Sequence, residues 1–268
     1  MSKGIALVTG GTKGIGKALC LRLKDAGYQV FSASRSTCLP EGMDEITHIS
    51  VDFSNSEETR SFAENFLADY GAPVVLINNA GYGAFYEWAE FPEEEITRQI
   101  QVLFSSPVEL CRIFAPAMAE QSRGVIVNLS SLAILYPLPF MPLYNAGKAA
   151  LSSFSQTLML EYNHSPAIID FRMGDVQTDF NRSASKPRDI QGFAKNAWAQ
   201  VEKQLNESIP VETAVYQILS RVEKEKSGTF YGGSFFHRVF LPMVQCFLLP
   251  SQIRRLIRFW YSLTDHRN

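Results

Sequence analysis

Cysteine and histidine are scarce, and their spacing fits neither a disulfide framework nor a metal site. The 268 residues include four cysteines that lie far apart, Cys20, Cys38, Cys111 and Cys246, with no CxxC pair among them. The four histidines form no HExxH motif. Small disulfide-stabilised domains and structural zinc sites need such spacings, so we expect neither, and we expect no bound metal.

A strong charge of one sign is also missing. Lys and Arg number 25 against 27 Asp and Glu, a net charge of −2, and charged residues make up only 19% of the chain. Nucleic-acid-binding domains usually carry a basic surface. We therefore expect no nucleic-acid partner.

The N-terminus shows no secretory signal. It enters an apolar run at Ile5 without an apolar core of signal length and without a cleavage site. We expect a cytoplasmic protein.

What the chain does contain is a regular alternation of short apolar runs and amphipathic stretches, typical of strands and helices around a parallel sheet. The predicted strands are Ile5–Val8, Gln29–Ser34, Ile46–Val51, Pro73–Ile77, Gly124–Leu129, Ala167–Phe171 and Gly228–Tyr231. The predicted helices are Lys17–Ala26, a segment that begins at Ser56, Glu93–Gln121 (as two helices) and Tyr144–His164. This pattern predicts one α/β domain over residues 1–233, followed by an extension over 234–268.

A glycine-rich turn links the first strand to the first helix. Glycines permit a tight turn and a close approach of the backbone to a pyrophosphate, and the helix N-terminus offers free N–H groups to phosphate. A turn of this kind is a weak signal alone, and its place between a strand and a helix strengthens it. The residues assigned to the cofactor here are Gly10, Thr12, Lys13, Gly14, Ile15 and Gly16.

The end of the second strand predicts which dinucleotide binds. NAD sites usually place an acidic residue there, on the ribose hydroxyls. This chain has Ser34 followed by Arg35, and Lys13 adds a second cation from the turn. A guanidinium can grip a 2′-phosphate that a carboxylate would repel, so we expect NADP(H).

Three further motifs follow in order: Asn-Asn-Ala-Gly over residues 78–81, a serine at 131, and a YxxxK motif formed by Tyr144 and Lys148, with the tyrosine thirteen residues after the serine. With the glycine-rich turn, they make residues 3–180 resemble the short-chain dehydrogenase/reductase family in its compact single-domain branch. The resemblance implies a Rossmann-type, doubly wound parallel sheet of about seven strands with helices on both faces.

The residue types fit carbonyl reduction. A spacing of four puts Tyr144 and Lys148 on one face of a helix. The ammonium favours the phenolate and should lower the pKa of the tyrosine. Tyr144 would then donate a proton to the carbonyl oxygen as hydride arrives, and Ser131 would hydrogen-bond that oxygen. The resemblance also implies that Lys148 binds the nicotinamide ribose.

The resemblance implies further cofactor contacts. Asp52, with Phe53 beside it, corresponds to the family residue near the adenine. The segment Asn79, Ala80 and Gly81 corresponds to the stretch along the adenine ribose. Gly174, Val176 and Thr178 correspond to the stretch that contacts the nicotinamide amide.

Two positions depart from the family pattern. Leu103 stands where the family usually has an asparagine whose backbone holds a water of the proton relay, which puts fast proton supply in doubt. Met173 replaces the usual proline before Gly174 and adds adaptable apolar surface.

The substrate side is apolar. The segment 132–142 contains no Arg or Lys that could hold a carboxylate or phosphate. It predicts a hydrophobic ketone or secondary alcohol, with ordinary core packing as the alternative. Residues 180–206 are polar and predict a mobile lid over the substrate, in which Phe193 and Trp198 help closure.

The tail is apolar and basic. Phe235–Leu249 is nearly all apolar but too short to span a bilayer. A helix capped by Ser251 would carry apolar residues on one face and arginines around the other, and from residue 235 onward five Arg oppose one Asp. These features fit peripheral contact with a membrane, and they fit slightly better a tail packed over the substrate cleft or against a subunit. The apolar face is Ile253, Leu256, Ile257 and Trp260, and the arginines are Arg254, Arg255 and Arg258.

The leading function is therefore an NADP(H)-dependent oxidoreductase. One alternative is a non-catalytic NADP(H) sensor on the same fold, which would normally have lost Tyr144 or Lys148. Another is a sugar-nucleotide epimerase or dehydratase, which shares YxxxK but usually has a larger substrate domain. The resemblance also implies a homo-oligomer, dimer or tetramer, formed through the helices that hold Leu103 and Tyr144.

Overall fold

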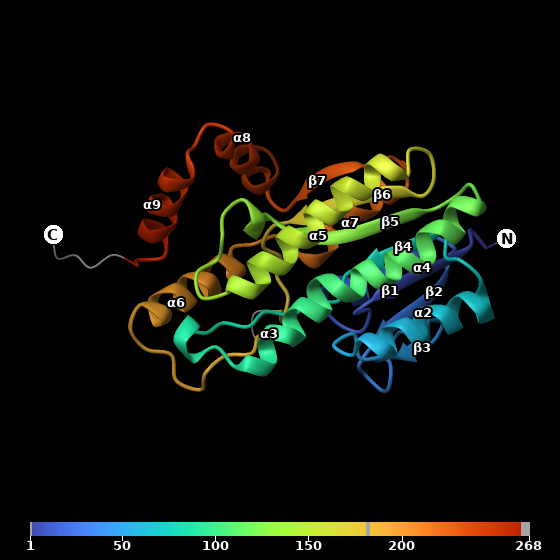
Figure 1. The fold of residues 1–268 in the computed structure, drawn as a ribbon, viewed down its shortest axis with the longest axis horizontal. Coiled ribbons are helices and arrows are strands. Elements are labelled where there is room, and N and C mark those ends of the chain that lie inside the picture. Colours follow the sequence, from blue (N-terminus) through green and yellow to red (C-terminus); the bar gives the residue numbers. More distant parts are fainter. Residues whose placement is uncertain (1, 181–182, 264–268) are drawn as a thin grey trace.

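Seven parallel strands form the central sheet in the order β3-β2-β1-β4-β5-β6-β7. The structure is a computed structural model that describes residues 2–180 and 183–263 (Figure 1). The strands are β1 (Ile5–Thr9), β2 (Gln29–Ser34), β3 (Thr47–Ser50), β4 (Val75–Asn78), β5 (Val125–Ser131), β6 (Ala167–Met173) and β7 (Gly228–Gly232). This confirms the predicted fold class, and the order reverses direction between β1 and β4, where ligands bind in doubly wound sheets.

Helices cover both faces of the sheet because successive strand residues point to opposite sides. Ala6 and Val8 of β1 pack in the cluster under α1 and α7, while Leu7 packs in the cluster under the other layer. One layer consists of α1 (Gly14–Asp25) and α7 (Val211–Val222). The other consists of α2 (Ser56–Tyr70), α4 (Ser106–Glu120) and α5 (Pro142–Glu161).

The segment Glu93–Gln121, predicted as two helices, is one helix interrupted by a π-turn. It comprises α3 (Glu93–Ile100), a π-helical segment (Gln101–Ser105) and α4. Glu93–Glu120 is the one helix among the described residues long and apolar enough to cross a membrane, but half of its most apolar window is buried, which is typical of a core helix.

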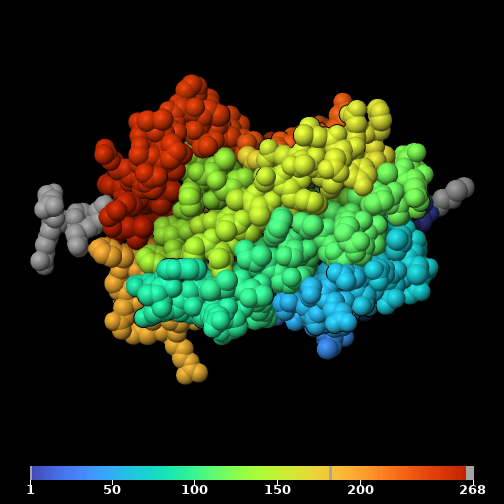
Figure 2. Space-filling view, viewed as in Figure 1, coloured from blue at the N-terminus to red at the C-terminus, as the bar shows by residue number. Residues whose placement is uncertain are grey.

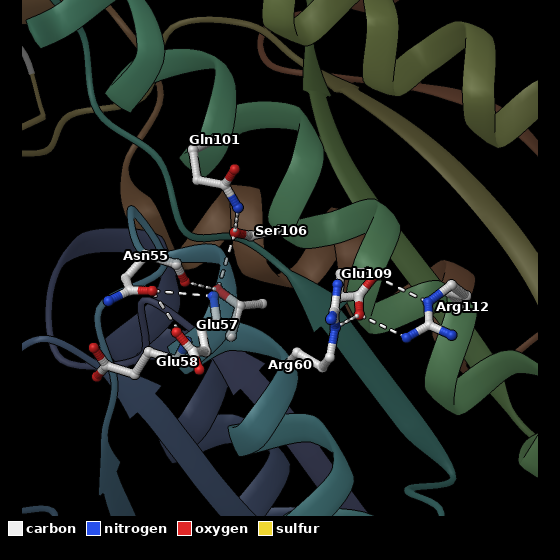
Figure 3. A network of polar contacts seen from close by, with 9 residues as sticks. Asn55, Glu57, Glu58, Arg60, Gln101, Ser106, Glu109 and Arg112 are labelled. Carbon is white, nitrogen blue, oxygen red and sulfur yellow. Dashed lines mark hydrogen bonds and ion pairs between the residues drawn. The ribbon is translucent and has the colours of Figure 1, made fainter.

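Polar side chains fix α2 against α4 (Figure 3). The Asn55 side chain accepts hydrogen bonds from the N–H groups of Glu57 and Glu58, which caps α2. Arg60 on α2 and Arg112 on α4 both bind the Glu109 carboxylate, at 3.0 and 2.7 Å. The Arg60–Glu109 ion pair therefore links the two helices, while the other bonds hold each helix.

Several predicted boundaries differ from the structure. α1 begins at Gly14 rather than Lys17, because the glycine-rich turn itself closes the first helical turn. α5 begins at Pro142 and ends at Glu161, so Tyr144 lies inside its first turn. The fixed φ of proline suits that first position.

The region predicted as a mobile lid contains an ordered helix, α6 (Gly192–Asn206). Trp198 on this helix is buried and packs its ring on Phe85 with centroids 4.9 Å apart, whereas Phe193 is exposed. Residues 181 and 182 of this predicted lid lie outside the described residues.

The tail is helical and returns to the domain. After β7 come a π-helical segment (Phe236–Phe240), α8 (Leu241–Gln245) and α9 (Pro250–Trp260). The prediction that Ser251 caps the last helix is wrong, since α9 begins at Pro250 and the Gln252 side chain accepts the Leu249 N–H. Figures 1 and 2 show this tail standing at the end of the molecule where α6 lies, opposite the N-terminus.

Candidate active site

The glycine-rich turn crosses the sheet at the switch point between β1 and β4. Gly10 and Gly14 have φ angles of +66° and +49°, a region that favours glycine. A Cβ atom at Gly16 would lie 2.1 Å from the Gly10 carbonyl oxygen, so no side chain fits there. The turn is therefore tightly closed, and both Gly10 and Gly14 line the cavity above the sheet.

Asn79 holds this turn from the neighbouring strand. Its side-chain amide donates to the carbonyl oxygens of Thr9 and Gly10, at 2.8 and 3.2 Å. The Thr9 hydroxyl in turn accepts the N–H groups of Asn79 and Ala80, at 3.0 and 2.9 Å. Thr9 begins the glycine-rich turn but is not among the predicted cofactor residues, and the β1–β4 pairing that brings it to Asn79 cannot be read from the local sequence.

The residues predicted at the adenosine end lie together beyond β2 and β3. Thr12 lies within hydrogen-bonding distance of the Ser34 hydroxyl at 3.1 Å, while Arg35 is exposed at the cavity. Burial opposes ionisation of Asp52, but hydrogen bonds from Ser54 and the charges of Arg35 and Arg98 outweigh it, so the pKa of Asp52 is lowered. Asp52 is therefore a carboxylate at neutral pH, beside the buried ring of Phe53.

Ser131, Tyr144 and Lys148 converge at the carboxyl end of the sheet, and all three line the cavity. Ser131 ends β5, and the other two lie in the first two turns of α5. The Lys148 ammonium is buried and donates to the Leu129 carbonyl oxygen on β5 at 2.5 Å. The predicted catalytic residues thus form one group.

The electrostatics of this group differ from the prediction. Burial raises the pKa of the Tyr144 phenol, an interaction with the Ser131 hydroxyl lowers it, and the charge of Asp175 raises it further. The expected lowering by Lys148 is therefore not what the structure has. Burial also lowers the pKa of Lys148 to about 8, against the opposing charge of Asp170.

A buried polar network supports the catalytic residues from behind. Asp170 on β6 accepts hydrogen bonds from Ser130, from Ser152 at 2.7 Å and from Arg172 at 3.0 Å. Beside it, Asn128 accepts from Asn78 at 2.7 Å. Adjacent parallel strands bring these residues together. The spacing of the motifs alone does not predict this network.

Leu103 lies at the π-turn and faces the catalytic residues. A Cβ atom at Gly81 would be 3.1 Å from the Leu103 side chain, and one at Gly147 would be 2.9 Å from it. Leu103 is fully buried between these two glycines. An apolar side chain therefore lies beside Gly81, which Lys148 also approaches.

One cavity of about 1430 Å³ connects the glycine-rich turn to the catalytic residues. Of the predicted site residues, Gly16 alone does not line it, because it packs beneath the turn. The predicted residues on its wall, besides the catalytic group, are Gly10, Thr12, Lys13, Gly14, Ile15, Ser34, Arg35, Asp52, Phe53, Asn79, Ala80, Gly81, Gly174, Val176 and Thr178.

The tail forms a further wall of this cavity. The Tyr136 hydroxyl donates to the Leu241 carbonyl oxygen at 2.9 Å, and the Tyr261 hydroxyl donates to the Gln204 side chain at 3.0 Å. These bonds link the tail to the segment after β5 and to α6. The tail residues on the wall are Phe236, His237, Phe240, Leu241, Val244, Leu256, Ile257, Phe259, Trp260 and Tyr261.

Asp175 and His237 also line the cavity, although no predicted motif assigns them a role. Asp175 follows Gly174 at the carboxyl end of β6, where ligands meet a parallel sheet, so its position carries a signal. His237 comes from the tail, which has no regular βα pattern, and only the folded structure places it here.

The cavity fits an extended dinucleotide. It offers a glycine turn without room for a Cβ at Gly16, cations at Lys13 and Arg35, and a catalytic group at its other end. Fold and site together define a class: Rossmann-type α/β proteins that bind a dinucleotide at the switch point of the sheet.

Comparison with known proteins narrows this class. The family model "short chain dehydrogenase" matches residues 4–189. The chain belongs to the short-chain dehydrogenase family. It is 32% identical over 190 residues to a 3-ketodihydrosphingosine reductase of Bacteroides thetaiotaomicron, covering 69% of this chain and 70% of that protein. It is also 32% identical to a very-long-chain 3-oxoacyl-CoA reductase of Bos taurus, over 61% and 56% of the two chains.

Solved structures share the fold. A short-chain dehydrogenase from Streptomyces avermitilis superposes with a TM-score of 0.80 at 23% identity over 100% of both chains. L-Sorbose reductase from Gluconobacter frateurii, complexed with NADPH and L-sorbose, has a TM-score of 0.68 at 21% identity, over 85% and 94%. A family member from Burkholderia phymatum in complex with NAD has a TM-score of 0.71 at 22%, over 84% and 88%. The chain thus shares the fold of these solved short-chain dehydrogenases.

Proposed function

We propose that this protein is an NADP(H)-dependent oxidoreductase that reduces a ketone or aldehyde, or oxidises a secondary alcohol, of a hydrophobic compound. The observation that carries the proposal is the convergence of Ser131, Tyr144 and Lys148 in the cavity that begins at the glycine-rich turn. A non-catalytic sensor would not need this group. The small lid and tail also differ from the larger substrate domain expected of a sugar-nucleotide epimerase.

The chain's residues have distinct roles in reduction. When bound, the reduced dinucleotide supplies the hydride that adds to the carbonyl carbon. Tyr144, whose raised pKa keeps it protonated at neutral pH, donates its proton to the carbonyl oxygen. Ser131 hydrogen-bonds the same oxygen, and Lys148 is held by Leu129 beside the phenol's helix face. The product is a secondary or primary alcohol.

The apolar wall supports a hydrophobic substrate. Leu132, Ala133 and Leu138 face the cavity on one side, and the tail contributes Phe240 and Trp260 on the other. Burying an alkyl chain against such a wall stabilises binding by about 0.8 kcal/mol per CH₂. The name of one curated relative, a very-long-chain 3-oxoacyl-CoA reductase, is consistent with this class.

A reduction screen tests the activity. Purified protein is incubated with NADPH and ketones of increasing alkyl length, and NADPH oxidation is followed by absorbance. We expect kcat/KM to rise with chain length, and Tyr144→Phe to lose 100-fold or more of kcat, in keeping with the loss of a general acid, while NADPH affinity is retained. Tight NADPH binding without oxidation of any ketone would favour the sensor.

The cofactor preference rests on charge. Ser34 is buried and bound to Thr12, which leaves Arg35 and Lys13 as exposed charges at that end of the cavity. We expect a higher kcat/KM with NADPH than with NADH. Arg35→Ala should raise KM for NADPH about tenfold or more and leave KM for NADH unchanged. An equal effect on both cofactors would contradict the assignment.

We further propose that the tail touches the surface of a cellular membrane from the cytoplasm. Ile253 and Tyr261 pack into the fold, whereas Phe247 and Leu249 are 82% and 64% exposed, next to Arg254, Arg255 and Arg258. Exposed apolar and aromatic side chains beside arginines suit an anionic lipid interface. The four free cysteines are compatible with a reducing compartment.

Vesicle sedimentation tests this contact. We expect the protein to pellet with phosphatidylserine-containing vesicles at low salt, and the Phe247→Ser, Leu249→Ser double variant to stay in solution. Tyr216→Ser, which removes an equally exposed ring on α7, is the control. Pelleting that is the same in both variants would contradict the proposal.

A homo-oligomer through α4 and α5 completes the proposal. Leu160 on α5 is 83% exposed, an unusual site for leucine on a free helix face. Light scattering should give a mass of two or four chains, reduced in Leu160→Glu. A monomer of 30.0 kDa in the wild type would contradict it.

A further inference from the structure

The face of the sheet that α5 covers changes from apolar to polar toward the catalytic end. Three successive pairs of residues from β5 and β6 lie on this face: Ile126 with Ile168, Asn128 with Asp170, and Ser130 with Arg172. The first pair is fully buried in the apolar cluster, whereas the next two pairs are polar and are buried or nearly so. The polar part of the interface therefore lies next to Ser131, which follows Ser130 at the end of β5.

Polar side chains on one face of α5 meet these strand residues in turn. Ser155 accepts a hydrogen bond from the Asn128 side-chain amide at 2.8 Å, and Ser152 donates to the Asp170 carboxylate at 2.7 Å. Lys148, a further turn toward the helix N-terminus, donates to a main-chain carbonyl oxygen of β5. Because residues three and four apart lie on one face of a helix, these bonds form a continuous row between α5 and the sheet.

Asp170 is the centre of this row. It is fully buried and binds both elements at once, accepting from Ser130 on β5 with one oxygen and from Ser152 on α5 with the other. Arg172 forms an ion pair with Asp170 at 3.0 Å and also donates to the Ser152 hydroxyl at 3.0 Å. The carboxylate thus joins the neighbour of the catalytic serine to the helix that carries the catalytic tyrosine.

Stability alone does not require such a pair. Removing two charges from water costs about as much free energy as their attraction returns, so apolar residues of similar size often stabilise a fold equally well. Apolar packing, however, loses a unique arrangement before it loses stability. A hydrogen bond forms only where its donor and acceptor lie opposite each other. The row of bonds is therefore suited to fix where α5 lies along the strands.

We propose that the Asp170–Arg172 pair is a positioning group that fixes α5 along β5 and thereby sets how Tyr144 faces Ser131. Neither Asp170 nor Arg172 is among the described residues that line the cavity, so the pair acts through the two catalytic side chains. A displacement of about 1 Å between reacting groups can cost on the order of 100-fold in rate. The assignment rests on the proposed oxidoreductase function and concerns the geometry of its catalytic group.

The first test replaces the pair by apolar side chains of similar size, Asp170→Leu together with Arg172→Met. We expect an unchanged or higher Tm, retained NADPH affinity by fluorescence, and a kcat for ketone reduction that falls about tenfold or more while KM changes little. Because the charge of Asp170 opposes the effect of burial on Lys148, kcat is measured at pH 6, below the Lys148 pKa of about 8. A wild-type kcat in this folded variant would overturn the proposal.

The second test keeps the pair and removes its contact with the helix. Ser152→Ala loses the hydroxyl that meets both Asp170 and Arg172. We expect kcat to fall about threefold or more, with unchanged KM and NADPH affinity. The matched control is Ser153→Ala, the same change at the neighbouring exposed position of α5, which should behave as the wild type does. Equal values of kcat in the two alanine variants would contradict the proposal, also if the double variant fails to fold.

A crystal structure of the double variant gives a result that does not depend on turnover. We expect α5 to be displaced along β5, with a longer distance between the Ser131 and Tyr144 hydroxyls than in the wild type. An unchanged distance would overturn the positioning role. If the wild type reduces no ketone, the oxidoreductase function fails, and this distance still decides whether the pair positions the helix.

Discussion

At Gly16 the space available is smaller than a methyl group, so a larger residue there should weaken binding of the cofactor. In Gly16→Ala the new Cβ would meet the Gly10 carbonyl at 2.1 Å, so the turn must open. We expect NADPH affinity to fall tenfold or more, measured by NADPH fluorescence, together with a lower Tm. Lys17→Ala, whose side chain binds only the Glu41 carbonyl at the surface, should change neither. Unchanged affinity in Gly16→Ala would show that the turn does not hold the phosphates.

Lys148 makes activity and stability respond to pH in opposite directions. Its pKa is about 8 in the folded chain against 10.5 as the ordinary value, because the ammonium is buried. Above pH 8 the folded protein loses this proton, so we expect kcat/KM for reduction to fall. Between pH 8 and 10.5 the unfolded chain binds more protons at this site than the folded one, so the site makes the protein more stable as pH rises.

The comparison variant for this pH response is Lys148→Met, which has no group to titrate. We expect its Tm to exceed that of the wild type most at pH 7 and by less as pH approaches 10. A Tm difference that does not depend on pH would show that the ammonium is not buried in solution.

At the scale of elements, the Glu109 carboxylate links α2 to α4. Hydrogen bonds from Arg112 outweigh partial burial and, with Arg60, lower the pKa of Glu109 to about 2. The stabilisation is present above the ordinary pKa of 4.5 and lost as pH falls through about 2. Because both arginines are largely exposed, we expect Glu109→Gln to cost about 1 kcal/mol or less at pH 7, measured by urea unfolding, and nothing near pH 2. Arg188→Gln, outside this network, is the control.

The sequence predicts the elements of the core better than those of the substrate side. All seven strands lie where apolar runs predict them, because a buried parallel strand needs continuous apolar residues. The predicted cofactor and catalytic residues follow the carboxyl ends of strands. Their motifs therefore predict that they lie together at one edge of the parallel sheet. The tail does not follow the alternation of strands and helices, so its elements are harder to predict. Ser251 resembles an N-cap, but Pro250 and Gln252 determine where α9 begins. The pKa of Tyr144 also depends on burial and on Asp175, which spacing cannot reveal.

At the scale of the whole molecule, the tail and the domain share one cavity. A chain that ends at Gly233 keeps the glycine-rich turn and the catalytic group but loses the wall formed by Phe240, Leu256 and Trp260. We expect NADPH affinity to be retained, while KM for long-chain ketones rises about tenfold or more and KM for short ketones changes little. A matched chain with Phe247→Ser keeps the wall and should behave as the wild type does. Equal loss for short and long ketones would show that the tail serves stability rather than substrate binding.

Because the domain and the tail share one cavity, the two halves of that cavity form one after the other during synthesis. Synthesis runs from the N-terminus, and domains fold as units as they emerge. Every residue assigned to the dinucleotide precedes Phe180, but α7 and β7 complete the helix layer and the sheet around it, so the cofactor half of the cavity is complete once residue 233 has been made. The substrate half is finished only by the last helix, α9, which binds Gln204 through Tyr261. We therefore expect a nascent chain that has passed residue 233 to hold the dinucleotide half of the cavity before the substrate wall exists, and a chain that ends there to keep that half with an open substrate side.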